Sequence, residues 1–254
     1  MLIKNIESGS SGNSTIIKCN RTYILIDLGI TYKKLLEELD NLKISIDDIK
    51  GLLITHNHRD HTIGLDTFIN KTNINIYIPK DMYKSLLKVS KKLTEERCVF
   101  IDDNFSIESI NIDLIHTSHD APYSVGYLLT YKNKSLVYIT DTGYINRKYM
   151  KLLSNKTIYL IESNHDTTML MDGPYPRILK ERIISDNGHL SNKQTASYLD
   201  KLVGENTKEI VLLHLSEKNN TEEKALEAMH EEELDKTMKI IIARQHEEGP
   251  LIEV

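Results

Sequence analysis

The sequence predicts an α/β fold in which two β-sheets are covered by helices on their outer faces. Short apolar runs typical of buried strands recur along the whole chain, and segments with helical patterns lie between them. The length of 254 residues suits one large α/β domain or two small ones. Because the sequence contains no internal repeat, low-complexity tract or long linker, we expect a single domain over residues 1–254.

The first part of the chain alternates strand and helix patterns. A loop of Ser, Gly and Asn at residues 8–13 separates the first two apolar runs, and leucines at 35, 36, 39 and 42 recur at helical spacing. The last strand of this part is closed by Pro79. The predicted strands are 2–7, 14–18, 22–27, 51–55 and 74–78, and the predicted helices are about 35–42 and 81–93.

The second part continues the pattern. One helix has clear end signals, because Ser191 and Gln194 form a capping box and Gly204 stands where a C-terminal cap is expected. The predicted strands are 109–115, 125–130, 135–140, 157–161, 209–214 and 238–242, and the predicted helices are about 175–185, 192–203 and 221–235.

The composition is that of a soluble globular protein, with 40% hydrophobic and 27% charged residues. The apolar runs are too short to cross a bilayer, and the first residues lack the apolar core of a signal peptide. The two cysteines, Cys19 and Cys98, form no pair motif, so we expect structural thiols and a reducing cytoplasm.

One segment carries the chemistry. His56, His58, Asp60 and His61 fall within six residues, directly after the apolar strand at 51–54. Imidazole is available unprotonated near neutral pH and is the commonest metal ligand. Buried without partners, these side chains would each cost a few kcal/mol, so we expect them in a cleft at the strand end. A solvated, histidine-rich loop is the alternative interpretation.

This His-x-His-x-Asp-His segment resembles the signature of the metallo-β-lactamase superfamily. Further residues resemble the remaining motifs of the family in order, most of them at the ends of apolar strands. The resemblance implies that Asp27 supports the metal loop from behind, that His119 and His214 are ligands, and that Asp141 bridges two metals. His116 competes with His119, and we favour His119 because the strand that follows it has the spacing of the family.

Five other segments are similar to the YycJ/WalJ group of this superfamily, and the likeness spans residues 1 to about 220. It implies a four-layer αβ/βα fold, two divalent metals and a DNA-directed 5′-to-3′ exonuclease activity. The segments are Ser8-Gly-Ser-Ser-Gly-Asn-Ser14, Glu162-Ser-Asn-His165-Asp166, Gly173-Pro-Tyr-Pro176, Gly188-His189-Leu-Ser-Asn192 and His214-Leu-Ser-Glu-Lys-Asn-Asn220.

The ligand set predicts a dinuclear centre. We expect one metal on His56, His58 and His119, and a second on Asp60, His61 and His214, with Asp141 shared by both. Such nitrogen and oxygen ligands suit Zn²⁺, Mn²⁺ or Fe²⁺. Two metals about 3.5–4 Å apart can activate a hydroxide and hold a phosphate.

Asp60, His165 and His189 are the candidate catalytic residues. His189 lies two residues before the capping Ser191, so it stands beside a helix N-terminus, where backbone donors attract phosphate. It is a candidate proton donor or phosphate ligand, and a purely structural role is an equal alternative. For His165 we favour a supporting structural role over catalysis.

The net charge of −5 excludes a wholly basic nucleic-acid binder but leaves room for a local basic patch. Arg177, Lys180, Arg182 and Lys193 could follow a DNA backbone. Two other functions compete with a nuclease acting on DNA. One is a hydrolase of a small thioester or lactam on the same scaffold, and the other is a metal-binding module without turnover. The sequence leaves the oligomeric state open.

Overall fold

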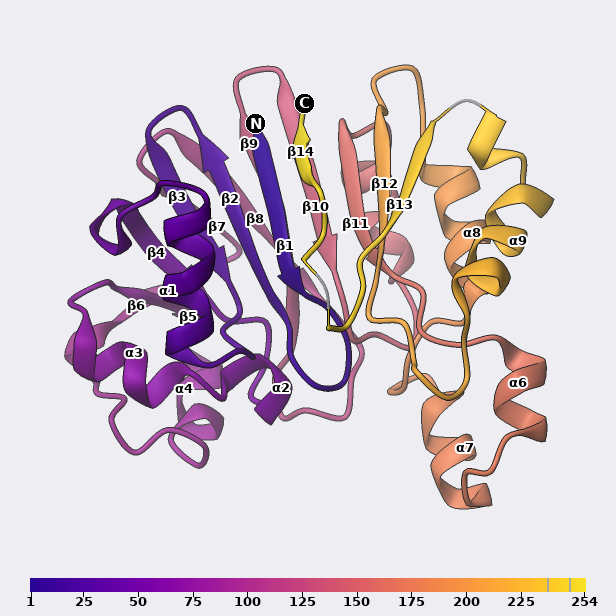
Figure 1. Ribbon diagram of the computed structural model, residues 1–254, viewed down its shortest axis with the longest axis horizontal. Helices are drawn as coiled ribbons and strands as arrows, with labels where there is room; N and C mark the ends of the chain where they lie inside the picture. The colour runs from indigo at the N-terminus through magenta and orange to yellow at the C-terminus, as the bar shows by residue number, and fades with distance from the viewer. Residues whose placement is uncertain (237, 247) are drawn as a thin grey trace. The chain divides into compact units, whose positions relative to one another are not determined.

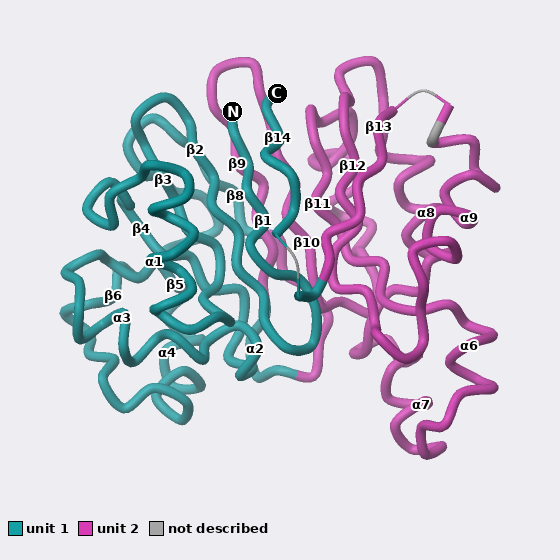
Figure 2. Tube along the Cα trace, in the orientation of Figure 1, with its two compact units in different colours: residues 1–114, 121–124, 245–253 teal, residues 115–120, 125–244, 254 magenta. Residues whose placement is uncertain are grey.

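The computed structural model describes residues 1–236, 238–246 and 248–254. The chain forms two compact units, which are coloured separately in Figure 2. Unit 1 consists of Met1–Leu114, Ala121–Ser124 and Gln245–Glu253, and unit 2 consists of Ile115–Asp120, Val125–Arg244 and Val254.

The first sheet has seven strands in the order β14-β1-β2-β3-β4-β5-β6. Neighbours from β14 to β3 are antiparallel, and those from β3 to β6 are parallel. The two ends of the chain lie side by side here, because β14 pairs with β1 (Figure 1). The strands are β1 (Leu2–Glu7), β2 (Ser14–Cys19), β3 (Thr22–Ile26), β4 (Ile49–Leu53), β5 (Ile76–Pro79), β6 (Cys98–Ile101) and β14 (Leu251–Glu253).

Three helices of unit 1, α1, α3 and α4, bury apolar side chains, whereas α2 buries His61 and Thr62. In α1 the predicted leucine stripe is buried at Leu35 and Leu39, whereas Leu36 is exposed. Tyr32 of α1 contacts Phe68 of α3 edge to face. The helices are α1 (Tyr32–Asn41), α2 (Arg59–Thr62), α3 (Leu65–Lys71) and α4 (Lys80–Leu86), with short 3-10 turns at Ile46–Asp48 and Glu95–Arg97.

The second sheet also has seven strands, in the order β13-β12-β11-β10-β9-β8-β7. The pairs β7–β8 and β9–β10 are antiparallel, and the run from β10 to β13 is parallel. The strands are β7 (Asn104–Ile107), β8 (Ile110–His116), β9 (Val125–Tyr131), β10 (Lys134–Ile139), β11 (Ile158–Glu162), β12 (Glu209–Leu213) and β13 (Lys239–Ile242). With helices flanking both sheets, the predicted α/β class is confirmed.

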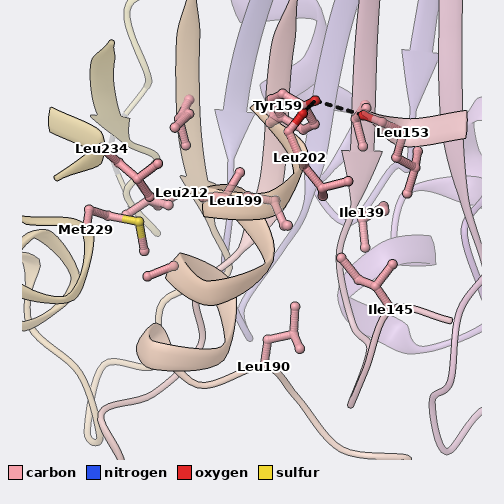
Figure 3. Packing of buried hydrophobic residues seen from close by; sticks show 14 of the residues in the cluster. Ile139, Ile145, Leu153, Tyr159, Leu190, Leu199, Leu202, Leu212, Met229 and Leu234 are labelled. Carbon is pink, nitrogen blue, oxygen red and sulfur yellow. Dashed lines mark hydrogen bonds between the residues drawn. The ribbon is translucent and has the colours of Figure 1, made fainter. Parts of the chain in front are cut away.

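The core of unit 2 lies between its strands and α8 and α9. Figure 3 shows Ile139, Leu199 and Leu212 packed together in this cluster. Tyr159 is fully buried, and its Oη lies 2.8 Å from the carbonyl oxygens of Leu153 and Leu202. Burial raises its pKa to about 12. The helices of unit 2 are α5 (Met150–Leu153), α6 (Thr167–Asp172), α7 (Arg177–Ile183), α8 (Asn192–Leu202) and α9 (Glu222–Glu231), with 3-10 turns at Arg147–Tyr149 and Leu234–Lys236.

Several predicted boundaries are wrong. The helix predicted at 81–93 ends at Leu86, because the chain turns so that Ser90 Oγ and Lys92 N donate to Asp66. The capping box of α8 is confirmed, but the helix ends on an extended Val203 instead of a left-handed Gly204.

Other elements were not predicted at all, among them β6, β7 and β14. Each of these strands has only three or four residues and buries a single side chain, so none is long enough to show the alternation by which a strand is recognised. Within the described part of the chain, no helix combines the length and apolar character that a membrane span needs.

A buried carboxyl in unit 1 generates a testable pH dependence. Glu38 is 5% exposed, and burial together with its hydrogen bond to Glu248 raises its pKa from 4.5 to about 6. Lys4 holds Glu248 as the carboxylate at 2.6 Å, so Glu38 is the protonated partner. The folded chain binds this proton more tightly than the unfolded chain does. Stability therefore falls as the pH rises from 4.5 through 6 and stays lower above that range.

We predict that Glu38→Gln raises the melting temperature at neutral pH by about 2–4 °C, because the amide donates to Glu248 without losing a proton. The gain should shrink toward zero below pH 4.5, where Glu38 is protonated in both states. Thermal denaturation across this pH range measures it. The exposed neighbour Glu37→Gln is the control and should show no such trend. An equal gain at every pH would contradict the assignment.

Candidate metal centre

Parallel strands bring the predicted ligands to strand ends. In unit 1, β3 and β4 are parallel, so Asp27 and Thr55 follow them at the same edge. In unit 2, β10, β11 and β12 are parallel, so Asp141, Glu162 and His214 gather at their carboxyl edge. The carboxyl edge of parallel strands is where ligands bind in α/β sheets. Each unit therefore presents a polar set at one edge.

In unit 1 the three motif histidines lie together. His58 is the N-cap residue of the short helix α2, which carries Asp60 and His61. The ring of His56 lies 4.6 Å from that of His58 and 4.1 Å from that of His61, centroid to centroid. His56 and His61 are buried, and His58 and Asp60 are partly exposed. The turn into α2 thus gathers side chains that a continued strand would have pointed to opposite faces.

Asp27 supports this loop from behind, as the resemblance implied. One carboxylate oxygen accepts from Thr55 N at 2.8 Å, and the other accepts from Thr55 Oγ1 at 2.8 Å and from His61 Nδ1 at 2.7 Å. Burial raises the pKa of Asp27, and the charge and hydrogen bond of His61 oppose that rise. Because Nδ1 of His61 contacts Asp27, the Nε2 atom on the other side of the ring points away from that carboxylate.

A second loop, at residues 9–13, fixes the backbone of the motif. Asn13 N donates to the carbonyl of Asp60 at 2.8 Å, and Asn13 Nδ2 lies 3.0 Å from His61 Nε2. At Gly29 a Cβ atom would stand 1.6 Å from the Asp60 carbonyl oxygen, so only glycine allows this approach. The Ser-Gly-rich segment that marked the group resemblance therefore braces the metal-binding loop.

Three strand-end residues adopt left-handed backbone conformations. Asp27 has φ 58°, Asp141 has φ 51° and His214 has φ 56°. Only a few per cent of non-glycine residues have positive φ, and such conformations cluster at functional sites. Each of these residues follows directly, or after one residue, on the last residue of a parallel strand. The strand prediction missed this feature, since it extended the strands to 27 and to 214.

In unit 2 a fully buried carboxylate organises the site. Glu162 Oε1 lies 2.6 Å from His189 Nδ1 and 3.0 Å from His214 Nδ1, and Oε2 accepts from Thr142 N and Leu190 N. Burial opposes the charge of Glu162, but these imidazoles outweigh it and lower the pKa to about 2. Sequence reasoning gave Glu162 no role, although it lies in a segment of the group resemblance.

His119 is oriented by the same part of unit 2. Its Nδ1 lies 3.2 Å from the carbonyl oxygen of Gly188, and its Nε2 lies 3.7 Å from Asp141 Oδ1. Burial lowers the pKa of His119, which keeps the ring in the neutral, metal-binding form. His116 stands at the end of β8, where its backbone N–H donates to Tyr149 Oη. The predicted ligand His119 therefore lies beside Asp141.

His165 lies in the loop after β11. Its side chain is buried, and its Nδ1 makes no hydrogen bond within the described residues. Burial lowers its pKa to about 4, so the ring is neutral at physiological pH. Its backbone pairs with Ser191 in an isolated bridge, and its carbonyl accepts from Asn192 N. This backbone link ties the loop after β11 to the start of α8.

The residues present fit divalent metals. In unit 2, one ligand atom from each of Asp141, Glu162, His189 and His214 lies within 4.8 Å of the others. Unit 1 supplies the imidazoles of His56 and His61, whose Nδ1 atoms contact Thr55 and Asp27, and Nε2 of His61 lies 3.0 Å from Asn13 Nδ2. Mixed imidazole and carboxylate donors of this kind suit Zn²⁺, Mn²⁺ and Fe²⁺.

The predicted DNA-backbone residues have partners of their own. Arg182 pairs with Asp120, Arg177 pairs with Glu181 at 2.6 Å, and Lys180 Nζ donates to a backbone carbonyl. These cations are therefore partly neutralised or engaged inside unit 2.

Comparison with known proteins gives concordant results. The family model described as "Beta-lactamase superfamily domain" matches residues 22–215. The chain is 34% identical over 224 residues to "Exodeoxyribonuclease WalJ" of Streptococcus pneumoniae serotype 2, covering 87% of this chain and 83% of that protein. It is 31% identical over 222 residues to "Exodeoxyribonuclease YycJ" of Bacillus anthracis, covering 87% and 84%.

Among solved structures, the Zn²⁺-bound PqqB from Methylobacterium extorquens superposes with a TM-score of 0.73, at 12% identity, over 100% of both chains. That likeness concerns the fold. The chain belongs to the metallo-β-lactamase superfamily. Within the superfamily it is a YycJ/WalJ-like protein.

We predict that Asp27→Asn weakens metal binding about 10- to 100-fold, because the amide cannot orient His61 as a carboxylate does. Asparagine tolerates the left-handed backbone at this position. Competition titration with a chelator measures affinity and stoichiometry, and thermal denaturation of the metal-free protein checks folding. Asp66→Asn is the matched control, since its carboxylate binds Ser90 and Lys92 N but no imidazole. Equal affinity of both variants would contradict this role of Asp27.

Proposed function

We propose that the protein is a dinuclear metal-dependent exodeoxyribonuclease that hydrolyses DNA from the 5′ end. The observation that carries the proposal is a fully buried carboxylate beneath the histidines of each unit: Asp27 binds His61 in unit 1. In unit 2, Glu162 binds His189 and His214. The names of relatives 31–34% identical over most of the chain supply the substrate class.

The metal ligands that we propose are those predicted from the sequence. One metal would be held by His56, His58 and His119 and the other by Asp60, His61 and His214, and Asp141 would be shared. We retain a single domain over residues 1–254 as part of this proposal. The metals are Zn²⁺ or Mn²⁺, with Fe²⁺ as a further candidate. Two thiols without a disulfide, Cys19 and Cys98, favour a reducing cytoplasm.

Two bound divalent metals would supply Lewis-acid activation of the phosphodiester and of water. The residues of the chain do the rest. The short helix α2 presents Asp60 beside His61, and Asn13 Nδ2 lies 3.3 Å from Asp60 Oδ2, which fixes that carboxylate.

His189 is suited to deliver a proton to the leaving sugar oxygen. Burial alone would lower its pKa, but the charge of Glu162 and the hydrogen bond to it raise the pKa above its ordinary value. Nδ1–H donates to Glu162 at 2.6 Å, so the second proton of the charged ring sits on Nε2, which is turned away from the carboxylate. His165, neutral and buried, supports the same loop through its backbone.

We predict Mn²⁺-stimulated release of mononucleotides from 5′-labelled DNA by the metal-loaded protein. Single- and double-stranded substrates, a thioester and a chromogenic lactam are compared in the same assay. Turnover of the thioester or lactam with none of DNA would overturn the proposed function in favour of a small-molecule hydrolase on the same scaffold.

For His189→Ala we predict a fall in kcat of roughly 10²- to 10⁴-fold with metal content unchanged, as expected for loss of a general acid. Steady-state kinetics and metal analysis are done on the same preparation. His230→Ala on α9 is the control and should keep full turnover. A smaller effect, seen as a higher KM with kcat unchanged, would mean that His189 contacts a phosphate. Loss of one metal would mean that His189 is a ligand.

A further inference from the structure

A basic hollow lies on unit 2, apart from the residues assigned to the chemistry. It has a volume of about 410 Å³ and is walled by the 3-10 turn Arg147–Tyr149 on one side and by α8 on the other. Arg147, Lys193 and Lys201 line it, and no aspartate or glutamate does so among the described residues. Three cations in one hollow contrast with the overall charge of −5.

The cations on α8 form one stripe. Lys193 and Lys201 are eight residues apart, which places them on one face of the helix and about 12 Å apart along its axis. Gln194 and Tyr198 form the adjacent stripe, one turn apart, and Tyr198 is half-buried. The hollow therefore places a row of positive charge beside an aromatic ring.

These charges are available for a ligand. Lys193 pairs with Glu231 at 3.4 Å, but both side chains are more than half exposed, so the pair is weak. Lys201 contacts the hydroxyl of Ser197 at 3.3 Å, which leaves its charge uncompensated. Arg147 is exposed, and no side-chain ion pair or hydrogen bond engages it within residues 1–236, 238–246 and 248–254.

The walls of the hollow continue the segments that carry the chemistry. Arg147 follows Asp141 by six residues, and Lys193 follows His189 by four. Ile145, between Asp141 and Arg147, is buried in the core cluster together with Leu190 (Figure 3). Both walls are thus fixed to the core that positions the candidate active residues.

A second hollow, on unit 1, has a different character. Its one lysine, Lys33, pairs with Glu37 at 3.6 Å, and Leu36 and Ile63 supply exposed apolar surface. It offers no net charge to a polyanion. The basic hollow of unit 2 is therefore the one whose chemistry fits a phosphate backbone.

We propose that the basic hollow binds a single-stranded segment of the DNA substrate, with backbone phosphates on Arg147, Lys193 and Lys201 and one base stacked on Tyr198. A cationic groove with an aromatic platform is the usual means of holding single strands without reading sequence. The proposal rests on the proposed function, because it gives the same substrate a further contact on unit 2.

The first test is the double variant Arg147→Ala/Lys201→Ala, with KM for a single-stranded oligonucleotide measured over a range of salt. Each lost phosphate contact lowers the slope of log KM against log salt by about 0.7, so the expected fall is about 1.4. The control Lys134→Ala/Lys208→Ala removes the same charge at the amino-terminal start of β10 and just before β12. This control should keep both the slope and the turnover. An unchanged slope in the Arg147/Lys201 variant overturns the inference.

The second test concerns the ring. Tyr198→Leu should raise KM for single-stranded DNA roughly five- to hundredfold, whereas Tyr198→Phe, which keeps the ring, should stay near the wild type. The stacking role is overturned if Tyr198→Leu and Tyr198→Phe change KM equally. It is also overturned if Tyr198→Leu raises KM for blunt duplex as much as for single strands. If wild-type protein hydrolyses DNA and these variants behave like it, only the hollow is wrong. If the wild type hydrolyses no DNA, the proposed function itself fails.

Discussion

The hydrogen bond between a buried carboxylate and an imidazole is the interaction on which the candidate site depends. Asp27 and Glu162 are both inaccessible to solvent, and each binds histidine Nδ1 at 2.6–3.0 Å. A carboxylate buried without partners would cost several kcal/mol, so these bonds offset the burial while they fix the tautomer of each ring. The same two carboxylates also accept backbone N–H groups, which joins ring orientation to the main chain.

The backbone supports this arrangement at a cost in strain. Asp27, Asp141 and His214 each take up left-handed conformations at the ends of parallel strands. Such a residue reverses the direction of the chain, so its side chain can turn to the ligand side instead of following the alternation of the strand. The strain, of order 1–3 kcal/mol at each residue, is sustained by surrounding hydrogen bonds such as Asp27 N to the Leu53 carbonyl.

Charge distribution would reconcile the acidic chain with the polyanionic substrate that we propose. The basic residues of α7 are compensated locally, as Arg177 is by Glu181 and Arg182 is by Asp120. Arg147 and Lys201 are not compensated in this way, and they face a common hollow. Because exposed charges are screened over about 8–10 Å in physiological salt, a local cluster of cations matters more to DNA than the net charge of the chain does.

The sequence by itself determined the fold class and the motif His56, His58, Asp60 and His61, because strand periodicity and ligand spacing are local properties of the chain. Resemblance added Asp27, Asp141 and His214 at strand ends, each of which the structure finds there. Only the tertiary structure showed that Glu162 contacts His189 and His214. Only it separated Arg147 and Lys201, which line the hollow, from the cations of α7 that form ion pairs. His189 and His214 lie 27 and 52 positions from Glu162 along the chain. Their partners are decided by strand order and helix packing, which no local pattern encodes.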